Sequence, residues 1–195
     1  MSWVRQITGV ALLASILSGC ALSPGPGEGA SSPEAEQQAA EAQLAQEFQT
    51  AIALKQRGDA DQARALFELL AAQHPERTGP LANLGILAYE AGETEQASDY
   101  FDAVLALNDG HRVALNHQGV IARQAGEFEA AEAYYRRALA ADGDYLPAML
   151  NLAFLLDIYL GRPDEALPLY EQYQALAEEP HPRLKDWIFD AKNRL

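Results

Sequence analysis

The sequence has little cysteine, few basic residues and no long apolar run, and each shortage excludes a class of protein. Cys20 is the only cysteine among 195 residues, so neither an intramolecular disulfide nor a multi-cysteine zinc site can form. Lys and Arg number 14 against 28 Asp and Glu, for a net charge of −14. The chain therefore lacks the basic cluster that nucleic acid or an anionic lipid surface would need.

Residue patterns for catalysis or metal binding are also missing. The four histidines do not have metal-ligand spacing; they are His74, His111, His117 and His181. There is no Gly-rich phosphate loop and no nucleophile elbow. Asp142-Gly143-Asp144 lacks the further acidic ligands of a calcium loop and is better explained as a turn. We therefore expect no enzyme activity, no metal and no bound cofactor.

The residues that are present favour helix. Hydrophobic residues make up 49% of the chain, but aromatics only 8%, and Ala and Leu dominate the apolar share. Both residues have high helix propensity. The composition therefore predicts an all-α protein.

The N-terminus has the layout of an export signal. A short basic start containing Arg5 precedes an apolar run from Ile7 to Leu17, which is too short to span a bilayer. The run ends in Leu17-Ser18-Gly19-Cys20, which resembles the lipobox of bacterial lipoproteins. The resemblance implies cleavage after residue 19 and lipid on Cys20, the covalent anchor that we expect instead of a cofactor. The alternative is an ordinary signal peptide, residues 1–19, with a chance cysteine.

The residues after Cys20 suggest a location and a tether. Ala21 stands where Asp would favour inner-membrane retention in the best-known lipoprotein sorting rule, so we expect anchoring in the inner leaflet of the outer membrane, facing the periplasm. Residues 20–32 are rich in Gly, Pro and Ser and cannot pack a core. Such a linker would hold the folded part roughly 20 Å from the anchor.

A repeat of 34 residues occupies most of the remaining chain. Glycine recurs at Gly58, Gly92 and Gly126, with Gly161 one residue late; small residues recur at Ala63, Ala97, Ala131 and Ala166; and aromatics recur at Phe67, Phe101, Tyr135 and Tyr170. These columns resemble the tetratricopeptide repeat family, whose unit is a pair of antiparallel helices. The resemblance implies an α-solenoid over 33–180, with four helix pairs at about 44–77, 78–111, 112–145 and 146–180.

Two prolines, Pro180 and Pro182, separate the array from a last helix within 181–195. Leu184, Trp187, Ile188, Ala191 and Leu195 recur on one face of this helix. We expect it to cap the open end of the array. The alternative is that Trp187 or Phe189 docks a partner.

Three columns on the first helix of each pair are candidates for a concave peptide-binding groove. The sixth position holds polar side chains suited to hydrogen-bonding a peptide backbone: Gln49, Asn83, His117 and Asn151, with Asn116 beside the third. The ninth holds Ile52, Ile86, Val120 and Phe154, and the twelfth holds Lys55, Tyr89, Arg123 and Asp157. The alternatives are that the amides support the helix pairs and that the apolar column packs against the neighbouring repeat.

The sequence therefore predicts a periplasm-facing lipoprotein that acts as a protein-interaction scaffold or adaptor. Lipoproteins of this layout serve in pilus assembly, outer-membrane assembly and energised transport clusters, and the residues do not choose among them. A second hypothesis is a non-catalytic recruiter or regulator of a cell-wall hydrolase or protease. A third is a structural envelope protein that forms homo-oligomers.

Overall fold

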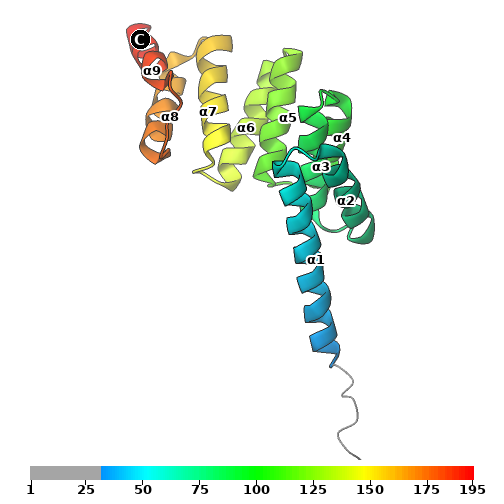
Figure 1. Cartoon of the computed structure of the whole chain (residues 1–195). Helices are drawn as coiled ribbons and strands as arrows, with labels where there is room; N and C mark the ends of the chain where they lie inside the picture. The colour runs from blue at the N-terminus through cyan, green and yellow to red at the C-terminus, as the bar shows by residue number, and fades with distance from the viewer. Residues whose placement is uncertain (1–31) are drawn as a thin grey trace, which may run out of the picture. The chain divides into compact units, whose positions relative to one another are not determined.

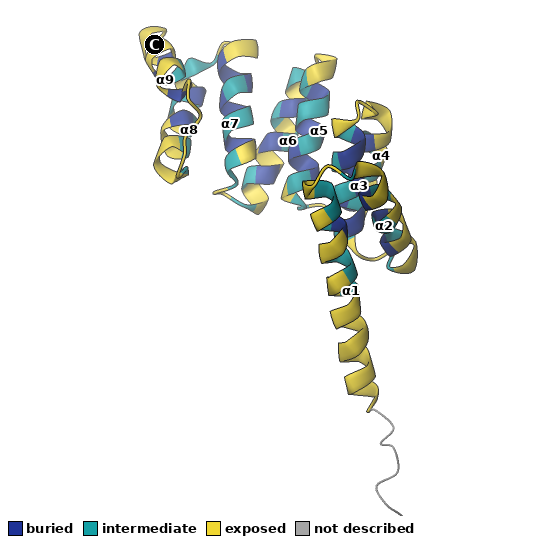
Figure 2. Ribbon diagram, in the orientation of Figure 1, coloured by how far each residue is buried: buried dark blue, intermediate teal, exposed yellow. Residues whose placement is uncertain are grey.

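The structure is a computed structural model that describes residues 32–195. The predicted signal peptide, Cys20 and the tether up to residue 31 lie outside the described residues. The chain divides into two compact units, Met1–Gln38 and Ala39–Leu195. The described part of the first unit is the start of helix α1, in which residues 33–43 are all exposed (Figure 2).

Helices in sequence order form the second unit, with no strand among residues 32–195 (Figure 1). They are α1 (Pro33–Gln56), α2 (Ala60–Gln73), α3 (Thr78–Glu90), α4 (Thr94–Leu107), α5 (Arg112–Ala125), α6 (Phe128–Ala141), α7 (Leu146–Phe154) with the π-helix η1 (Leu155–Tyr159), α8 (Pro163–Leu176) and α9 (Leu184–Asn193). From α2 onward, consecutive helices pack against each other, and α5 also contacts α3 and α7. Helix α1 packs on α2 through Phe48 and Phe67. The predicted all-α solenoid of four helix pairs with a C-terminal helix is confirmed.

The turn within each pair depends on glycine. Gly58, Gly92, Gly126 and Gly161 all have positive φ, between 62° and 84°. Only glycine takes this conformation without steric cost. After Gly126 the Glu127 N–H donates to the Ala122 carbonyl at 2.9 Å, which closes the helix end with the hydrogen bond of a Schellman motif. The glycine column of the sequence is thus a column of helix C-caps.

The alanine and aromatic columns form the core between the two helices of each pair. Ala63, Ala97, Ala131 and Ala166 are fully buried, as are the aromatics Phe67, Phe101, Tyr135 and Tyr170. In two repeats the facing residue is glycine: a Cβ on Gly85 would lie 2.7 Å from the Phe101 ring, and one on Gly119 would lie 2.5 Å from the Tyr135 ring. The close approach of the helices therefore requires glycine at these two positions.

The extra residue of the fourth repeat is accommodated by a change of helix type. Residues Leu155–Tyr159 form a π-helix, which takes more residues per turn than an α-helix. It corrects one sequence prediction: Asp157, placed on the groove by its repeat position, is only 2% exposed and pairs with Arg194. The widened turn directs this carboxylate into the protein and leaves Ile158 and Tyr159 exposed.

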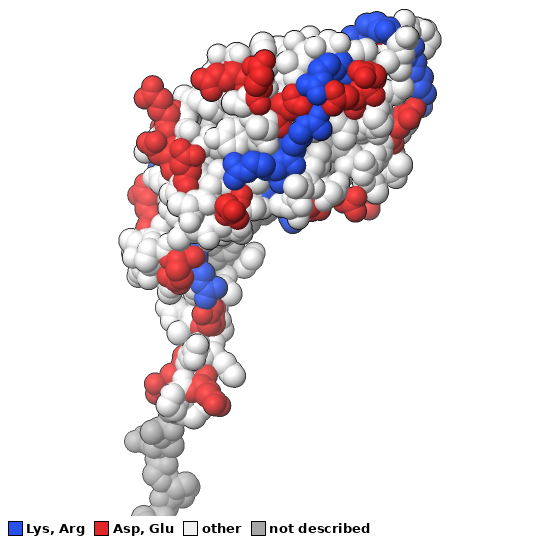
Figure 3. Space-filling model, turned by 180° about the vertical axis from the view of Figure 1, so that it is seen from behind, with Lys and Arg blue, Asp and Glu red and all other residues white. Residues whose placement is uncertain are grey.

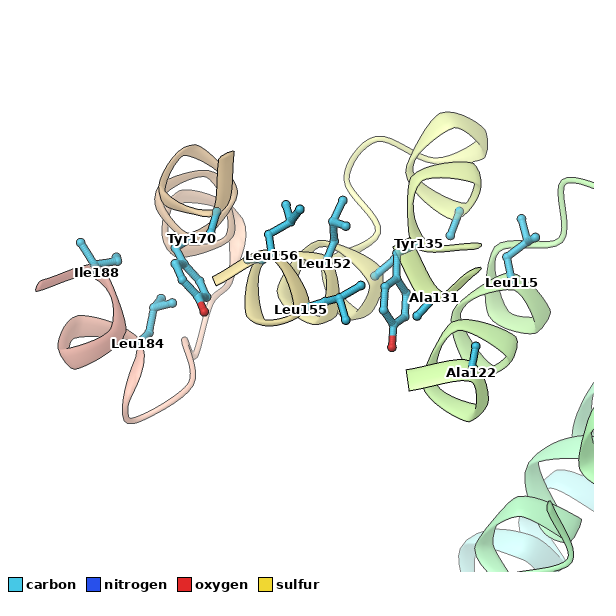
Figure 4. Close-up of a cluster of buried hydrophobic side chains, with 14 residues drawn as sticks. Leu115, Ala122, Ala131, Tyr135, Leu152, Leu155, Leu156, Tyr170, Leu184 and Ile188 are labelled. Carbon is cyan, nitrogen blue, oxygen red and sulfur yellow. The ribbon is translucent and has the colours of Figure 1, made fainter. Parts of the chain in front are cut away.

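Helix α9 extends the core at the C-terminal end. A buried apolar cluster runs from Leu115 through Tyr135 and Leu155 to Leu184 and Ile188 (Figure 4). Trp187 packs against this cluster as expected. Leu195 departs from the prediction, because it lies beyond the end of α9 and is 68% exposed.

Candidate protein-binding face

The first helices of the four pairs form one candidate surface, which we call the first-helix face: residues 39–56 of α1 together with α3, α5 and α7. Neighbouring first helices are joined by side chains of the predicted columns. Lys55 Nζ donates to Asn83 Oδ1 at 2.5 Å, and Asn151 Nδ2 donates to Asn116 Oδ1 at 2.9 Å. A ring contact between Tyr89 and His117, with centroids 5.6 Å apart, links the second repeat to the third, so residues of all four repeats are connected.

The amide column is largely used within the chain. Asn83 donates through Nδ2 to the Gly79 carbonyl at 3.0 Å while its oxygen accepts from Lys55. Asn116 is buried, whereas Gln49 is exposed. Asn83 is thus already hydrogen-bonded within the chain, and a peptide would have to displace Lys55 to use it.

The apolar column is half-buried along its length. Ile52, Ile86 and Val120 each pack at the edge of an apolar cluster. Phe154 instead contacts other aromatic rings, with Tyr159 at 5.9 Å and Trp187 at 5.7 Å between ring centroids. Part of each side chain is covered, and part faces the surface.

The twelfth position supplies the charge of the face. Burial lowers the pKa of Lys55, and the nearby Glu90 carboxylate partly opposes this. The Arg123 guanidinium lies 5.9 Å from the centroids of both the Phe154 and Tyr159 rings. Neither cation forms a salt bridge with a carboxylate of residues 32–195.

His117 occupies the middle of the face. Its ring stacks on Phe101, with centroids 4.9 Å apart, and meets Tyr89 edge-on at 5.6 Å. Burial, followed by the positive charge of Lys55, lowers its pKa. Its Nδ1 atom is buried without a hydrogen-bond partner in the described part of the chain. His117 is thus a neutral ring packed into the face and not an exposed cation.

Several other basic residues are neutralised in ion-pair networks. Arg136 and Arg162 each pair with both Glu132 and Glu165, and Arg64 pairs with Glu93 at 2.8 Å. Figure 3 shows acidic and basic side chains next to one another on the side turned away from the viewer of Figure 1. Lys55 and Arg123 differ from these residues in having no carboxylate partner among residues 32–195.

The sequence columns did not predict several interactions at the face. Tyr159 reaches Arg123 only because the π-helix shifts the register of the fourth repeat. The side chain of Gln124 donates to the Tyr89 hydroxyl at 2.7 Å, and the hydroxyl of Tyr135 is buried beside the face. The one-residue delay of Gly161 was the only sequence feature that indicated the shifted register of Tyr159. The repeat pattern contains no indication of the Gln124–Tyr89 hydrogen bond or of the buried Tyr135 hydroxyl.

Residues 32–195 contain no cluster of His, Cys, Asp and Glu that could hold a metal ion. None of the helices in the same range is both long enough and apolar enough to cross a bilayer.

Comparison with solved structures identifies the same architecture in several proteins. The crystal structure of the MamA protein matches with a TM-score of 0.62 and 20% identity, over 77% of this chain and 81% of that one. The PilF structure of Pseudomonas aeruginosa matches with a TM-score of 0.67 and 19% identity, over 77% and 68%. A thermophilic tetratricopeptide repeat protein of Thermus thermophilus matches with a TM-score of 0.61 and 18% identity, over 77% and 81%. At these identities the likeness concerns the fold.

No curated protein matches the sequence significantly. Family models described as tetratricopeptide repeat match residues 35–77 and 82–145, which together exceed half of the chain. Tetratricopeptide repeats are generally non-catalytic modules that bind other proteins. With the fold and the repeat columns in agreement, the chain belongs to the tetratricopeptide repeat family.

Proposed function

We propose that the chain is a lipid-anchored scaffold of the bacterial cell envelope, whose first-helix face holds an extended segment of a protein partner. The observation that carries the proposal is the face itself. Its half-buried apolar column runs through all four repeats, beside two cations without carboxylate partners among the described residues. An apolar stripe with polar groups at its side suits a partner held by apolar contact and oriented by hydrogen bonds.

The anchored location is supported by the sequence Leu17-Ser18-Gly19-Cys20 and by the Gly/Pro/Ser-rich residues after it. A thiol with several acyl chains would hold the protein firmly, because a single chain gives only marginal membrane binding. The short tether would then keep the array near the membrane. Ala21 favours the outer membrane over the inner one as the site of residence.

Fractionation tests the anchor. Cys20→Ala should move the protein from the membrane pellet to the soluble periplasmic fraction and leave the helical circular-dichroism spectrum unchanged. Ser18→Ala is the matched control, because it keeps a small residue beside the cleavage site and should remain membrane-bound. Undiminished membrane association of Cys20→Ala would refute the anchor.

Capture from detergent-solubilised envelope tests the face. A double variant, Ile86→Ala with Phe154→Ala, should lose partners that the wild type retains. The control, Leu69→Ala with Leu107→Ala, removes equally apolar side chains that are 50% and 47% exposed on α2 and α4. Equal recovery of every partner by both double variants would refute binding through the first-helix face.

A further inference from the structure

An unusual group of hydrogen-bond donors surrounds Arg123 on the first-helix face. The guanidinium lies against both the Phe154 and Tyr159 rings, at 5.9 Å from each centroid. Contact with ring faces engages the positive charge but uses no N–H group. Arg123 Nε is buried and has no hydrogen-bond partner in the described range. The cation is thus held in place with unused donor capacity.

Tyr135 adds a second unused donor. Its side chain is fully buried, and its ring is fixed against Gly119, where even a Cβ would lie 2.5 Å away. The hydroxyl is buried: its oxygen lies close to the Arg123 guanidinium, but its own proton has no acceptor in residues 32–195. The pKa of Tyr135 is raised, chiefly by burial; hydrogen bonding to Arg123 and the Arg123 charge oppose this, and the nearby Tyr89 and Tyr159 add to it. The hydroxyl therefore keeps its proton at neutral pH.

Two further hydroxyls complete the group. Tyr89 accepts a hydrogen bond from Gln124 at 2.7 Å, which leaves its own proton free to donate. Tyr159 is 42% exposed at the rim of the group. The pKa of Arg123 is raised although burial alone would lower it, because the Tyr135 and Tyr159 oxygens lie close enough to stabilise its charge. Arg123 therefore lies close to Tyr135 and Tyr159, and Tyr89 lies close to Tyr135.

We propose that this group, Arg123 with Tyr89, Tyr135 and Tyr159, binds the carboxylate of an Asp or Glu side chain in the partner's extended segment. A carboxylate only accepts hydrogen bonds, and its two oxygens match the planar guanidinium. No carboxylate of the described residues forms a salt bridge with Arg123. Leaving donors buried and unpartnered is costly, so a ligand that pairs them is bound selectively.

The rest of the face fits such a ligand. Val120 and Phe154 on neighbouring helices flank Arg123, so apolar residues beside the acidic one would contact the apolar column. The net charge of −14 repels acidic chains elsewhere on the surface. Binding of an acidic side chain at Arg123 would therefore fix which residue of the partner segment lies against each repeat. This inference rests on the proposed function, because it needs a partner on the first-helix face.

Peptide selection on the full chain, purified in detergent, tests the inference. Random peptides displayed on phage are selected on the wild type, and the affinities of winning peptides are measured by fluorescence polarisation. We expect winners with Asp or Glu next to apolar residues. Changing that acid to its amide, or Arg123→Gln in the protein, should weaken binding about ten- to a hundredfold, as expected for a lost hydrogen bond to a charged group. The amide peptide tested on Arg123→Gln should lose little more affinity than either change causes alone.

Two further variants separate binding from folding. Tyr135→Phe should weaken binding of the acidic peptide severalfold without lowering the thermal midpoint of the free protein, because the hydroxyl proton has no acceptor among the described residues. Arg137→Gln is the matched control, since Arg137 lies on α6 over the Tyr134 ring and its loss removes the same charge. It should leave the affinity unchanged.

The outcomes distinguish this inference from the proposed function. One contrary outcome is that the selected peptides lack an acid, bind the wild type and Arg123→Gln equally, and lose binding to the Ile86→Ala and Phe154→Ala double variant. That result would overturn the carboxylate site but leave the proposed scaffold function standing. A phosphoserine peptide that binds more tightly than its Glu counterpart would overturn the carboxylate in favour of a phosphate. If no peptide is selected, or if binding survives the Ile86→Ala and Phe154→Ala changes, the proposed function itself fails.

Discussion

A buried ion pair joins the C-terminal helix to the fourth repeat and makes a quantitative prediction possible. The Asp157 carboxylate, whose side chain is 1% exposed, contacts the Arg194 guanidinium, which is 42% exposed. The Tyr170 hydroxyl donates to the other carboxylate oxygen at 3.4 Å. Three segments, η1, α8 and the residue after α9, therefore meet at one acid.

Arg194→Met keeps most of the side-chain length but removes the charge. Asp157 would then remain buried with only the long hydrogen bond from Tyr170. Breaking a fully buried ion pair costs about 3–5 kcal/mol. Because water reaches the exposed part of Arg194, we expect a loss of about 2 kcal/mol in the free energy of unfolding, between that range and the value of a surface pair.

Urea unfolding followed by circular dichroism measures this loss. Asp157→Asn should destabilise the wild type but stabilise the Arg194→Met variant, because it removes the uncompensated charge. Lys192→Met, two residues earlier in α9, is the control: its 2.8 Å pair with Glu171 is half-exposed and should be worth less than about 0.5 kcal/mol. Additive effects of the Asp157 and Arg194 changes would refute the reasoning.

Three further predictions concern the packing and titration of the repeats. Gly119→Ala should lower the free energy of unfolding by about 1–2 kcal/mol despite the better helix propensity of alanine, because its Cβ would overlap the buried Tyr135 ring. Gly143→Ala, which has no such neighbour, should be neutral or slightly stabilising in the same urea assay. A stabilised Gly119→Ala variant would contradict the packing. Gly126→Ala should cost about 1 kcal/mol in urea, because φ there is +82°, and an unchanged midpoint would argue against the left-handed cap. Since the pKa of His117 is lowered in the fold, the unfolded chain binds more protons below about pH 6.5, and the thermal midpoint should fall as pH drops from about 7.5 to 5.5. His117→Asn should flatten that fall, and an identical pH profile would exclude His117 as its source.

The repeat made most of the fold predictable from the sequence. Its glycine column marks the positive-φ turns, and its alanine and aromatic columns are the buried residues, because helix pairing imposes the same steric needs in every unit. The capping role of 181–195 followed from the apolar spacing of Leu184 and Ile188. These features depend on local geometry that recurs with the sequence period.

The candidate site was predictable in position but not in chemistry. Repeat columns identified which helices supply it, yet columns assume one register, and the π-helix breaks that register at Asp157 and Tyr159. The bond from Lys55 to Asn83 and the lack of an acceptor for the Tyr135 hydroxyl proton in residues 32–195 depend on distances between helices. Such distances are set by packing between helices, and they do not appear as a repeating pattern in the sequence.

The nearest-neighbour packing of the second unit also has a mechanical consequence. Every substantial helix contact connects elements that are adjacent, or one apart, along the chain. A load applied between Ala39 and Leu195 would therefore pass through each helix interface in turn, and the weakest one would open first while the others stayed folded. The array would then lengthen in discrete steps of one helix or one pair, and each step would be visible as a separate rupture in single-molecule stretching.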